Sequence, residues 1–175
     1  MNYINPAAKL VPVHHSLWEM SDVFLPEFFN ALPSYHNQTR WNMDRALSRL
    51  SWPCFPYDNN LDPLQQLGSE MAQLVGQALS RDVGYTMAKL FLDLPGSCVP
   101  LHSDSDSIDI MAQVYITQTD WPLPGTVFEQ PWPHTVQYRY NCGYFSLNQD
   151  RKLHHSGEVT GVCRSSVGFQ LYFAK

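Results

Sequence analysis

The chain has 175 residues, of which 44% are hydrophobic and 13% are aromatic, and its formal net charge is −5 at pH 7. This composition excludes an intrinsically disordered chain, and the length suffices for one hydrophobic core without disulfide or metal staples. The acidic balance disfavours non-specific binding to nucleic acid, because that function needs a basic face. No apolar run approaches the length of a membrane span.

Cysteine spacing and the N-terminus bear on the cellular compartment. The four cysteines, Cys54, Cys98, Cys142 and Cys163, show no C-x-x-C pair and none of the close spacing of a zinc ribbon. Free thiols in a reducing compartment are the expectation, although a disulfide that includes Cys98 stays open. Residues 1–6 lack the basic start and continuous apolar stretch of a signal peptide, so a soluble protein of the cytoplasm is expected.

Residues 1–85 are predicted to form a scaffold of helices and loops. The strongest helix signal starts at Asp62 and Pro63, a capping carboxylate before a proline at the first helical position. Apolar residues then recur at helical spacing, at Leu64, Leu67, Met71, Leu74, Val75, Ala78 and Leu79. This stripe predicts a helix that packs against the outside of a sheet. Residues 22–32 are a second helix candidate, interrupted by Pro26, and residues 52–60 are expected to form an ordered loop.

The segment after this scaffold carries the first candidate metal ligands. Residues 94–102 predict a tight turn that leads into a short strand, because Pro95 and Gly96 favour a turn and the following residues suit an extended chain. Side chains two residues apart on a strand point the same way. His102 and Asp104 can therefore reach the same metal ion.

Further strands are expected between residues 108 and 146. Residues 108–117 alternate, with one apolar face made by Ile110, Ala112, Val114 and Ile116. Gln113 and Tyr115 fall on the other face. Residues 121–126 predict a loop that ends in a strand.

Two tryptophans stand next to prolines in this region. Trp121 and Trp132 are candidates for a lid over a binding site, because loops carry such functions. Packing in the core is the alternative for large aromatic side chains.

A third metal ligand is expected about fifty residues after His102, at His154 or His155. Their side chains would point in opposite directions on an extended chain, so only one of them can join His102 and Asp104. Two imidazoles and one carboxylate occupy one face of a metal and leave three positions open. Such a site can hold a bidentate 2-oxo acid and still admit O₂, whereas a structural zinc site is closed.

The last strand is expected at residues 164–173. Arg164 and Ser166 share a face at its start. An arginine fork grips a carboxylate bidentately and cannot deprotonate, which suits the distal end of a dicarboxylate.

These motifs resemble the 2-oxoglutarate/Fe(II)-dependent dioxygenase superfamily, with an H-x-D, a distal histidine and an R-x-S in the same order over residues 86–175. The turn at Pro95 and Gly96 is similar to that of the aspartyl/asparaginyl β-hydroxylase branch, and the H-x-S-G at residues 154–157 is similar to the phytanoyl-CoA hydroxylase branch. The resemblance implies a mostly β fold with flanking helices, namely a double-stranded β-helix (jelly-roll, cupin-like). It would occupy residues 86–175 of a single domain spanning residues 1–175, after the helical N-terminal scaffold.

The resemblance also implies a ligand set for iron and the co-substrate. Fe(II) would be held by His102, Asp104 and His154, since ten residues between the histidine and Arg164 is a common family spacing; His155 stays the alternative. The C5 carboxylate of 2-oxoglutarate would be bound by Arg164 and Ser166.

The rest of the co-substrate pocket is predicted from strand faces. Gln113 and Tyr115 are expected to line it. By the resemblance, Phe91 stands where the hydroxylase branch would offer a small polar residue. Lys89, on the same face as Phe91, is a candidate for a compensating cation, but a solvated lysine is the favoured interpretation.

The expected activity is hydroxylation of an unidentified substrate, with formation of succinate and CO₂. The partners would be O₂ and either a peptide side chain or a small metabolite; neither a membrane nor nucleic acid is expected, and the oligomeric state stays open. Two alternatives from other classes are a cupin-like metalloprotein that does not use 2-oxoglutarate and a non-catalytic jelly-roll binding module.

Overall fold

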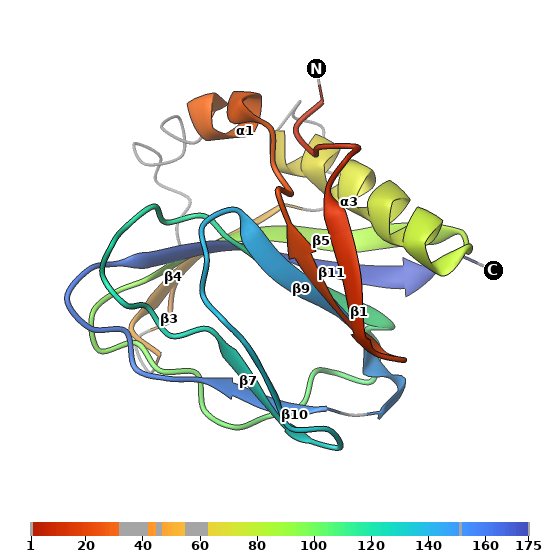
Figure 1. Cartoon of the computed structure of the whole chain (residues 1–175). Helices are drawn as coiled ribbons and strands as arrows, with labels where there is room; N and C mark the ends of the chain where they lie inside the picture. The colour runs from red at the N-terminus through yellow and green to blue at the C-terminus, as the bar shows by residue number, and fades with distance from the viewer. Residues whose placement is uncertain (1, 32–41, 45–46, 55–62, 151, 175) are drawn as a thin grey trace.

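A computed structural model describes residues 2–31, 42–44, 47–54, 63–150 and 152–174 of the chain. Two antiparallel β-sheets lie face to face, and a long helix covers the outer face of the larger one (Figure 1). The larger sheet has eight described strands, in the spatial order β1 (Lys9–His14), β2 (Leu17–Ser21), β9 (Cys142–Leu147), β6 (Ile110–Tyr115), β11 (Arg164–Phe173), β5 (Val83–Asp93), β4 (Arg49–Cys54) and β3 (Asn42–Asp44). The smaller sheet has three, in the order β10 (Leu153–Ser156), β7 (Thr126–Gln130) and β8 (His134–Val136).

The chain alternates between the two sheets from β5 onward. It passes from β5 to the segment at His102, which bridges His154 of β10, and then returns to β6 in the larger sheet. The alternation continues through β7 and β8, β9, β10 and β11. This winding is that of a jelly-roll and confirms the predicted double-stranded β-helix.

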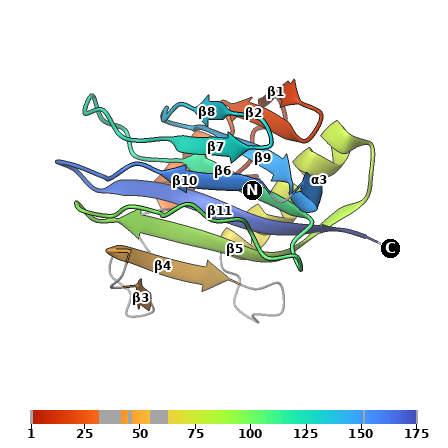
Figure 2. The same cartoon turned by 90° about the horizontal axis from the view of Figure 1, so that it is seen from below.

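The N-terminal half contributes more strands than its sequence predicts. β1 and β2 extend the larger sheet beyond β9, and β4 and β3 extend it beyond β5 (Figure 2). Residues 1–85 therefore add sheet edges as well as α1 and α3, rather than a purely helical scaffold. The strands of this half that precede β5 have only 3 to 6 residues each, too short to show a clear alternation in sequence.

The loop expected at residues 52–60 is partly wrong, because residues 52–54 belong to β4. Pro53 is tolerated there because β3 pairs only with residues 49–51, so one edge of Pro53 faces no other described strand. Residues 55–60 lie outside the described residues.

The long helix forms as predicted. α3 (Pro63–Leu79) buries Leu64, Leu67, Met71 and Val75 completely, and of the predicted stripe only Ala78 is exposed. The buried residues of α3 form one core with apolar side chains on the outer face of the larger sheet. These sheet residues include Ala88, Leu90, Ile110, Ala112, Val114, Ile116, Val167 and Phe169. The predicted apolar face of Ile110, Ala112, Val114 and Ile116 is thus confirmed, although β6 spans Ile110–Tyr115 instead of residues 108–117.

The second helix is shorter than its sequence predicts. α1 (Pro26–Ala31) begins at Pro26. The N–H of the first helical residue makes no hydrogen bond within the helix, so proline, which lacks this N–H, is tolerated there. Pro26 therefore starts this helix instead of interrupting it.

A smaller core lies on the other side of the larger sheet. It consists of Leu17, Tyr115, Phe128, Val136 and Tyr144, contributed by both sheets. Its aromatic side chains hold the two sheets together beside the polar region described below.

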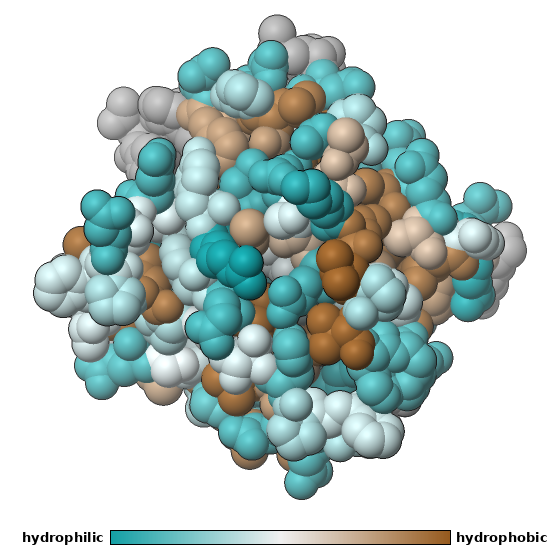
Figure 3. Space-filling model, viewed as in Figure 1, coloured by the Kyte–Doolittle hydropathy of each residue, from teal (hydrophilic) through white to brown (hydrophobic). Residues whose placement is uncertain are grey.

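The surface seen in Figure 3 carries hydrophobic side chains over the edge strand β1. Val11 and Val13 are exposed there, and Pro12 between them removes one donor from the strand. No helix in the described part of the chain is long and apolar enough to cross a membrane.

Candidate active site

Two histidines and an aspartate meet at the edge of the smaller sheet. His102 and His154 are directly opposed, with backbone hydrogen bonds of 3.0 and 2.8 Å in the two directions. Their ring centroids are 4.3 Å apart, and Oδ2 of Asp104 lies 3.8 Å from Nε2 of His154. One potential ligand atom from each of the three residues lies within 4.8 Å of the others. The structure thus brings together the three residues that the sequence predicts as metal ligands.

The backbone determines which nitrogen each imidazole can offer to a metal. Nδ1 of His102 lies 2.9 Å from the carbonyl oxygen of Pro100, and Nδ1 of His154 lies 3.1 Å from that of Lys152. A carbonyl only accepts, so each Nδ1 carries a proton and donates it. Nε2 keeps its lone pair, which is the form that binds a metal. Burial lowers the pKa of His154, which also favours the neutral imidazole.

His155, the alternative ligand, is paired with an acidic side chain instead. Its Nε2 lies 3.0 Å from Oε1 of Glu129, and the two side chains are partly exposed. It does not belong to the group of ligand atoms that meet within 4.8 Å. The geometry therefore favours His154.

A cavity of about 170 Å³ lies beside the candidate ligands, between the two sheets. The candidate ligands line it together with residues from both sheets. Among the latter are His155, Ser156, Thr126, Arg49, Phe91, Gln113, Tyr144 and Arg164.

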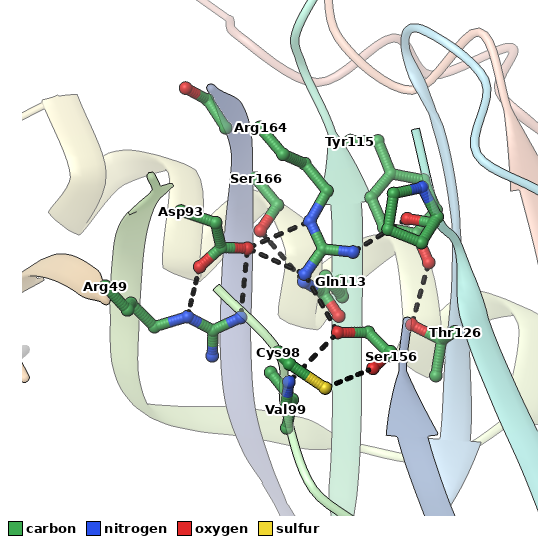
Figure 4. Close-up of polar contacts among 12 residues, drawn as sticks. Arg49, Asp93, Cys98, Val99, Gln113, Tyr115, Thr126, Ser156, Arg164 and Ser166 are labelled. Atoms are coloured by element: carbon green, nitrogen blue, oxygen red, sulfur yellow. Dashed lines mark hydrogen bonds and ion pairs between the residues drawn. The ribbon is translucent and has the colours of Figure 1, made fainter. Parts of the chain in front are cut away.

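Arg164 lines this cavity but already makes several hydrogen bonds (Figure 4). Its Nε and Nη2 donate to Oδ2 of Asp93 at 2.9 and 2.7 Å. Nη1 donates to the carbonyl oxygen of Pro124 at 2.7 Å, and Nη2 also donates to Oγ of Ser156 at 3.1 Å. Since Pro124 and Ser156 belong to the side of the smaller sheet, Arg164 ties the two sheets together.

Asp93 and Arg49 are functional candidates that the sequence analysis missed. Arg49 and Arg164 are both aligned with Asp93 across three neighbouring strands, so the three side chains form one row. Both guanidinium groups bind the Asp93 carboxylate, which is fully buried (Figure 4). A signal for Asp93 existed in its place just before the turn at Pro95, but no local pattern marks Arg49.

Gln113 connects two polar groups at the cavity wall. Its Nε2 donates to Oγ of Ser166 at 2.8 Å, and the Tyr144 hydroxyl donates to its Oε1 at 3.2 Å. Ser166 and Tyr115 are fully buried and do not themselves line the cavity; Tyr115 instead hydrogen-bonds to Thr126 at 2.8 Å. Burial raises the pKa of Tyr144 and raises that of Tyr115 to about 12, so both hydroxyls keep their protons at neutral pH.

Lys89, the second cation considered from sequence, does not line the cavity. Its Nζ lies 5.6 Å from the centroid of the Phe91 ring. Burial lowers the pKa of Lys89, and the nearby charge of Arg49 lowers it further. The second cation on the cavity wall is Arg49.

Neither predicted lid tryptophan lines this cavity. Trp121 is 50% exposed and its ring covers Gly161, where an added Cβ would lie 2.5 Å from Cε2 of Trp121. Trp132 is 53% exposed and stacks on His14 at 4.5 Å, beside a separate cavity. These exposures exclude the core-packing alternative, and the lid role stays a prediction.

Replacing Trp121 by alanine is expected to lower the melting temperature by less than about 3 °C, because half of its side chain is already in water. Phe128→Ala is the matched control, since Phe128 is 2% exposed and its truncation should cost about 3–5 kcal/mol, or roughly 10 °C or more. Thermal melts monitored by circular dichroism compare the two. Equal losses in the two variants would show that Trp121 is a packing residue.

Several solved structures share this fold. The chain superposes on a Pseudomonas putida prolyl-4-hydroxylase with a TM-score of 0.64 at 18% identity, over 92% of this chain and 93% of that one. A prolyl 4-hydroxylase from Phytophthora capsici gives 0.67 at 14% identity, over 91% and 59%. HygX from Streptomyces hygroscopicus, with nickel, 2-oxoglutarate and hygromycin B bound, gives 0.64 at 12% identity, over 89% and 82%.

At these identities the similarity establishes the fold alone, which the chain shares with the two prolyl hydroxylases and with HygX. No protein-family model matches the sequence, and no curated protein is detectably similar to it. The resemblances to two particular branches stay predictions.

Proposed function

We propose that the chain is an Fe(II)- and 2-oxoglutarate-dependent dioxygenase that hydroxylates a substrate still to be identified. The observation that carries this proposal is the meeting of His102, Asp104 and His154 beside a cavity that a buried arginine also lines. The cavity thus has candidate metal ligands on its wall and a cation, Arg164, as well. This arrangement suits a ligand that chelates the metal through one end and carries a negative charge at the other.

The donor atoms fit a catalytic metal rather than a structural one. Two Nε2 lone pairs and one carboxylate oxygen make a facial set that suits Fe(II) and leaves positions for further ligands. The hydrogen bonds from Nδ1 to backbone carbonyls orient both imidazoles before a metal binds. When bound, iron would couple 2-oxoglutarate and O₂ to the oxidation: one oxygen atom of O₂ would convert a substrate C–H bond to C–OH, and the other would enter succinate as CO₂ is released.

The protein's own side chains would bind and orient the co-substrate. Arg164 contributes positive charge at the distal carboxylate, and the Tyr144, Gln113 and Ser166 chain holds the neighbouring polar wall in place. The Tyr144 phenol, which lines the cavity, stays protonated, so it donates to Gln113 and adds no negative charge beside a dianionic ligand. HygX, which shares the fold, binds 2-oxoglutarate, which supports the same choice for this chain.

The described cysteines support a cytoplasmic setting as part of the proposal. Cys98, Cys142 and Cys163 are free thiols, which suits a reducing compartment such as the cytoplasm. The substrate class, a peptide side chain or a small metabolite, is left to experiment.

The test is 2-oxoglutarate turnover with purified protein, Fe(II) and O₂. Slow formation of succinate without any added substrate is expected, and His102→Ala should abolish it. A wild-type protein that binds metal but not 2-oxoglutarate would instead support the cupin-like alternative. A wild-type protein that binds neither would support a non-catalytic binding module.

Arg164→Ala is expected to weaken 2-oxoglutarate binding by tenfold to several thousandfold, because truncating one partner of a buried charge-assisted contact costs about 2–5 kcal/mol. Iron binding should change much less, since Arg164 contacts none of the three candidate ligands. Lysine at this position should restore binding only in part, because it lacks the planar fork. Calorimetric titration with each ligand measures both affinities, and wild-type affinity for 2-oxoglutarate in Arg164→Ala would contradict the assignment.

A further inference from the structure

The row formed by Arg49, Asp93 and Arg164 carries an unbalanced charge on the cavity wall. It holds two guanidinium groups and one carboxylate, hence a net charge of +1. The exposed fractions of the three side chains are 14%, 0% and 2% in that order. Arg49 and Arg164 line the cavity and Asp93 lies behind them; among the described residues, the acidic one that lines the cavity is Asp104, which belongs to the candidate metal ligands. A buried excess cation is costly unless an anion neutralises it, so this wall is complementary to an anionic ligand.

The two arginines differ in how many donors they have left. A guanidinium has five N–H donors. Arg164 uses four of them, one on Nε, one on Nη1 and two on Nη2, so one remains. Arg49 uses only two, one on Nε and one on Nη2, both toward Asp93, and no other described residue accepts from it. Arg49 therefore has three donors left for a ligand.

The position of Arg49 is fixed from two sides. Asp93 accepts from Nε and Nη2 in a fork, and Cζ of Arg49 lies 4.6 Å from the centroid of the Phe91 ring. Phe91 and Arg49 both line the cavity. A guanidinium held in this way loses little conformational freedom when a carboxylate binds.

We propose that Arg49 is a second residue for the distal carboxylate of a 2-oxo dicarboxylic acid, acting beside Arg164, and that Asp93 positions both arginines. The assignment rests on the proposed function and names the residue that makes the site select a dicarboxylate. A 2-oxo acid without the distal carboxylate gains nothing from Arg49. Selectivity between the two kinds of acid therefore depends on Arg49.

The experiment compares two ligands on two proteins. Wild-type and Arg49→Ala proteins, loaded with Ni(II) so that no turnover occurs, are titrated calorimetrically with 2-oxoglutarate and with 2-oxopentanoate, which lacks the distal carboxylate. Arg49→Ala should weaken 2-oxoglutarate binding by about tenfold or more and change 2-oxopentanoate binding by less than about twofold. Arg49→Lys should recover part of the selectivity.

Arg81→Ala is the matched control. Arg81 also stacks on an aromatic ring, with its Cζ 3.7 Å from the centroid of Phe173, but does not line this cavity. Its loss removes the same charge and should leave both affinities unchanged.

The possible outcomes test the role of Arg49 separately from the proposed function. Unchanged selectivity in a folded Arg49→Ala protein overturns the role of Arg49 while the proposed function stands. A wild-type protein that binds 2-oxoglutarate no better than 2-oxopentanoate overturns the proposed function as well. If Arg49→Ala fails to fold by its melting curve, Arg49→Gln replaces it, and unchanged selectivity in that variant has the same meaning.

Discussion

His154→Ala is expected to weaken Fe(II) binding by more than about a hundredfold, whereas His155→Ala should bind Fe(II) as the wild type does. Loss of a direct ligand exceeds the tenfold to hundredfold cost typical of residues that only support one. Nε2 of His154 lies in the group of ligand atoms with His102 and Asp104, whereas Nε2 of His155 is paired with Glu129. Both variants remove one imidazole from the same strand, so they control for each other.

Iron stoichiometry after anaerobic reconstitution measures the effect, with circular dichroism to show that the fold persists. His102→Ala and Asp104→Ala should behave as His154→Ala does. Iron loss in His155→Ala combined with retention in His154→Ala would reverse the assignment. If all four variants keep their iron, the assignment of a metal centre to these residues is wrong.

The candidate metal ligands could be predicted because their geometry is mostly local. His102 and Asp104 were paired from the period of an extended chain, although an isolated bridge at His102 stands in place of the expected short strand. The choice of His154 over His155 came from the spacing to Arg164 in the family that the sequence resembles. Only their meeting needs the tertiary fold, which the backbone pair between His102 and His154 provides. The alternation at residues 110–116 and the stripe of α3 were readable for the same reason.

The row formed by Arg49, Asp93 and Arg164 could be predicted only in part. Arg164 stands at the start of a strongly patterned strand, but its neighbours Asp93 and Arg49 are 71 and 115 residues away in sequence. Their alignment depends on the pairing of β4, β5 and β11, and β4 is a short strand that contains Pro53. A pattern within one window carries no information on such a row. The same limit explains why the N-terminal strands were missed.

Asp93→Asn is expected to destabilise the protein by about 3–5 kcal/mol, because it leaves one buried and one partly buried guanidinium group without their counter-charge. For a chain of this size that corresponds to a fall in melting temperature of roughly 10 °C or more. Asp22→Asn is the matched control, since its partner is the exposed Lys9 at 3.5 Å and surface pairs contribute little.

The double variant Asp93→Asn/Arg49→Gln separates charge imbalance from lost hydrogen bonds. Removing one of the two uncompensated cations should make the double variant lose less stability than the sum of the two single variants. If Asp93→Asn instead melts within about 2 °C of the wild type, Pro124 and Ser156 suffice to hold Arg164, and Asp93 is not needed to position it. Additive losses of stability would mean that Arg49 and Asp93 act independently. Another contact would then have to hold Arg49 beside the cavity.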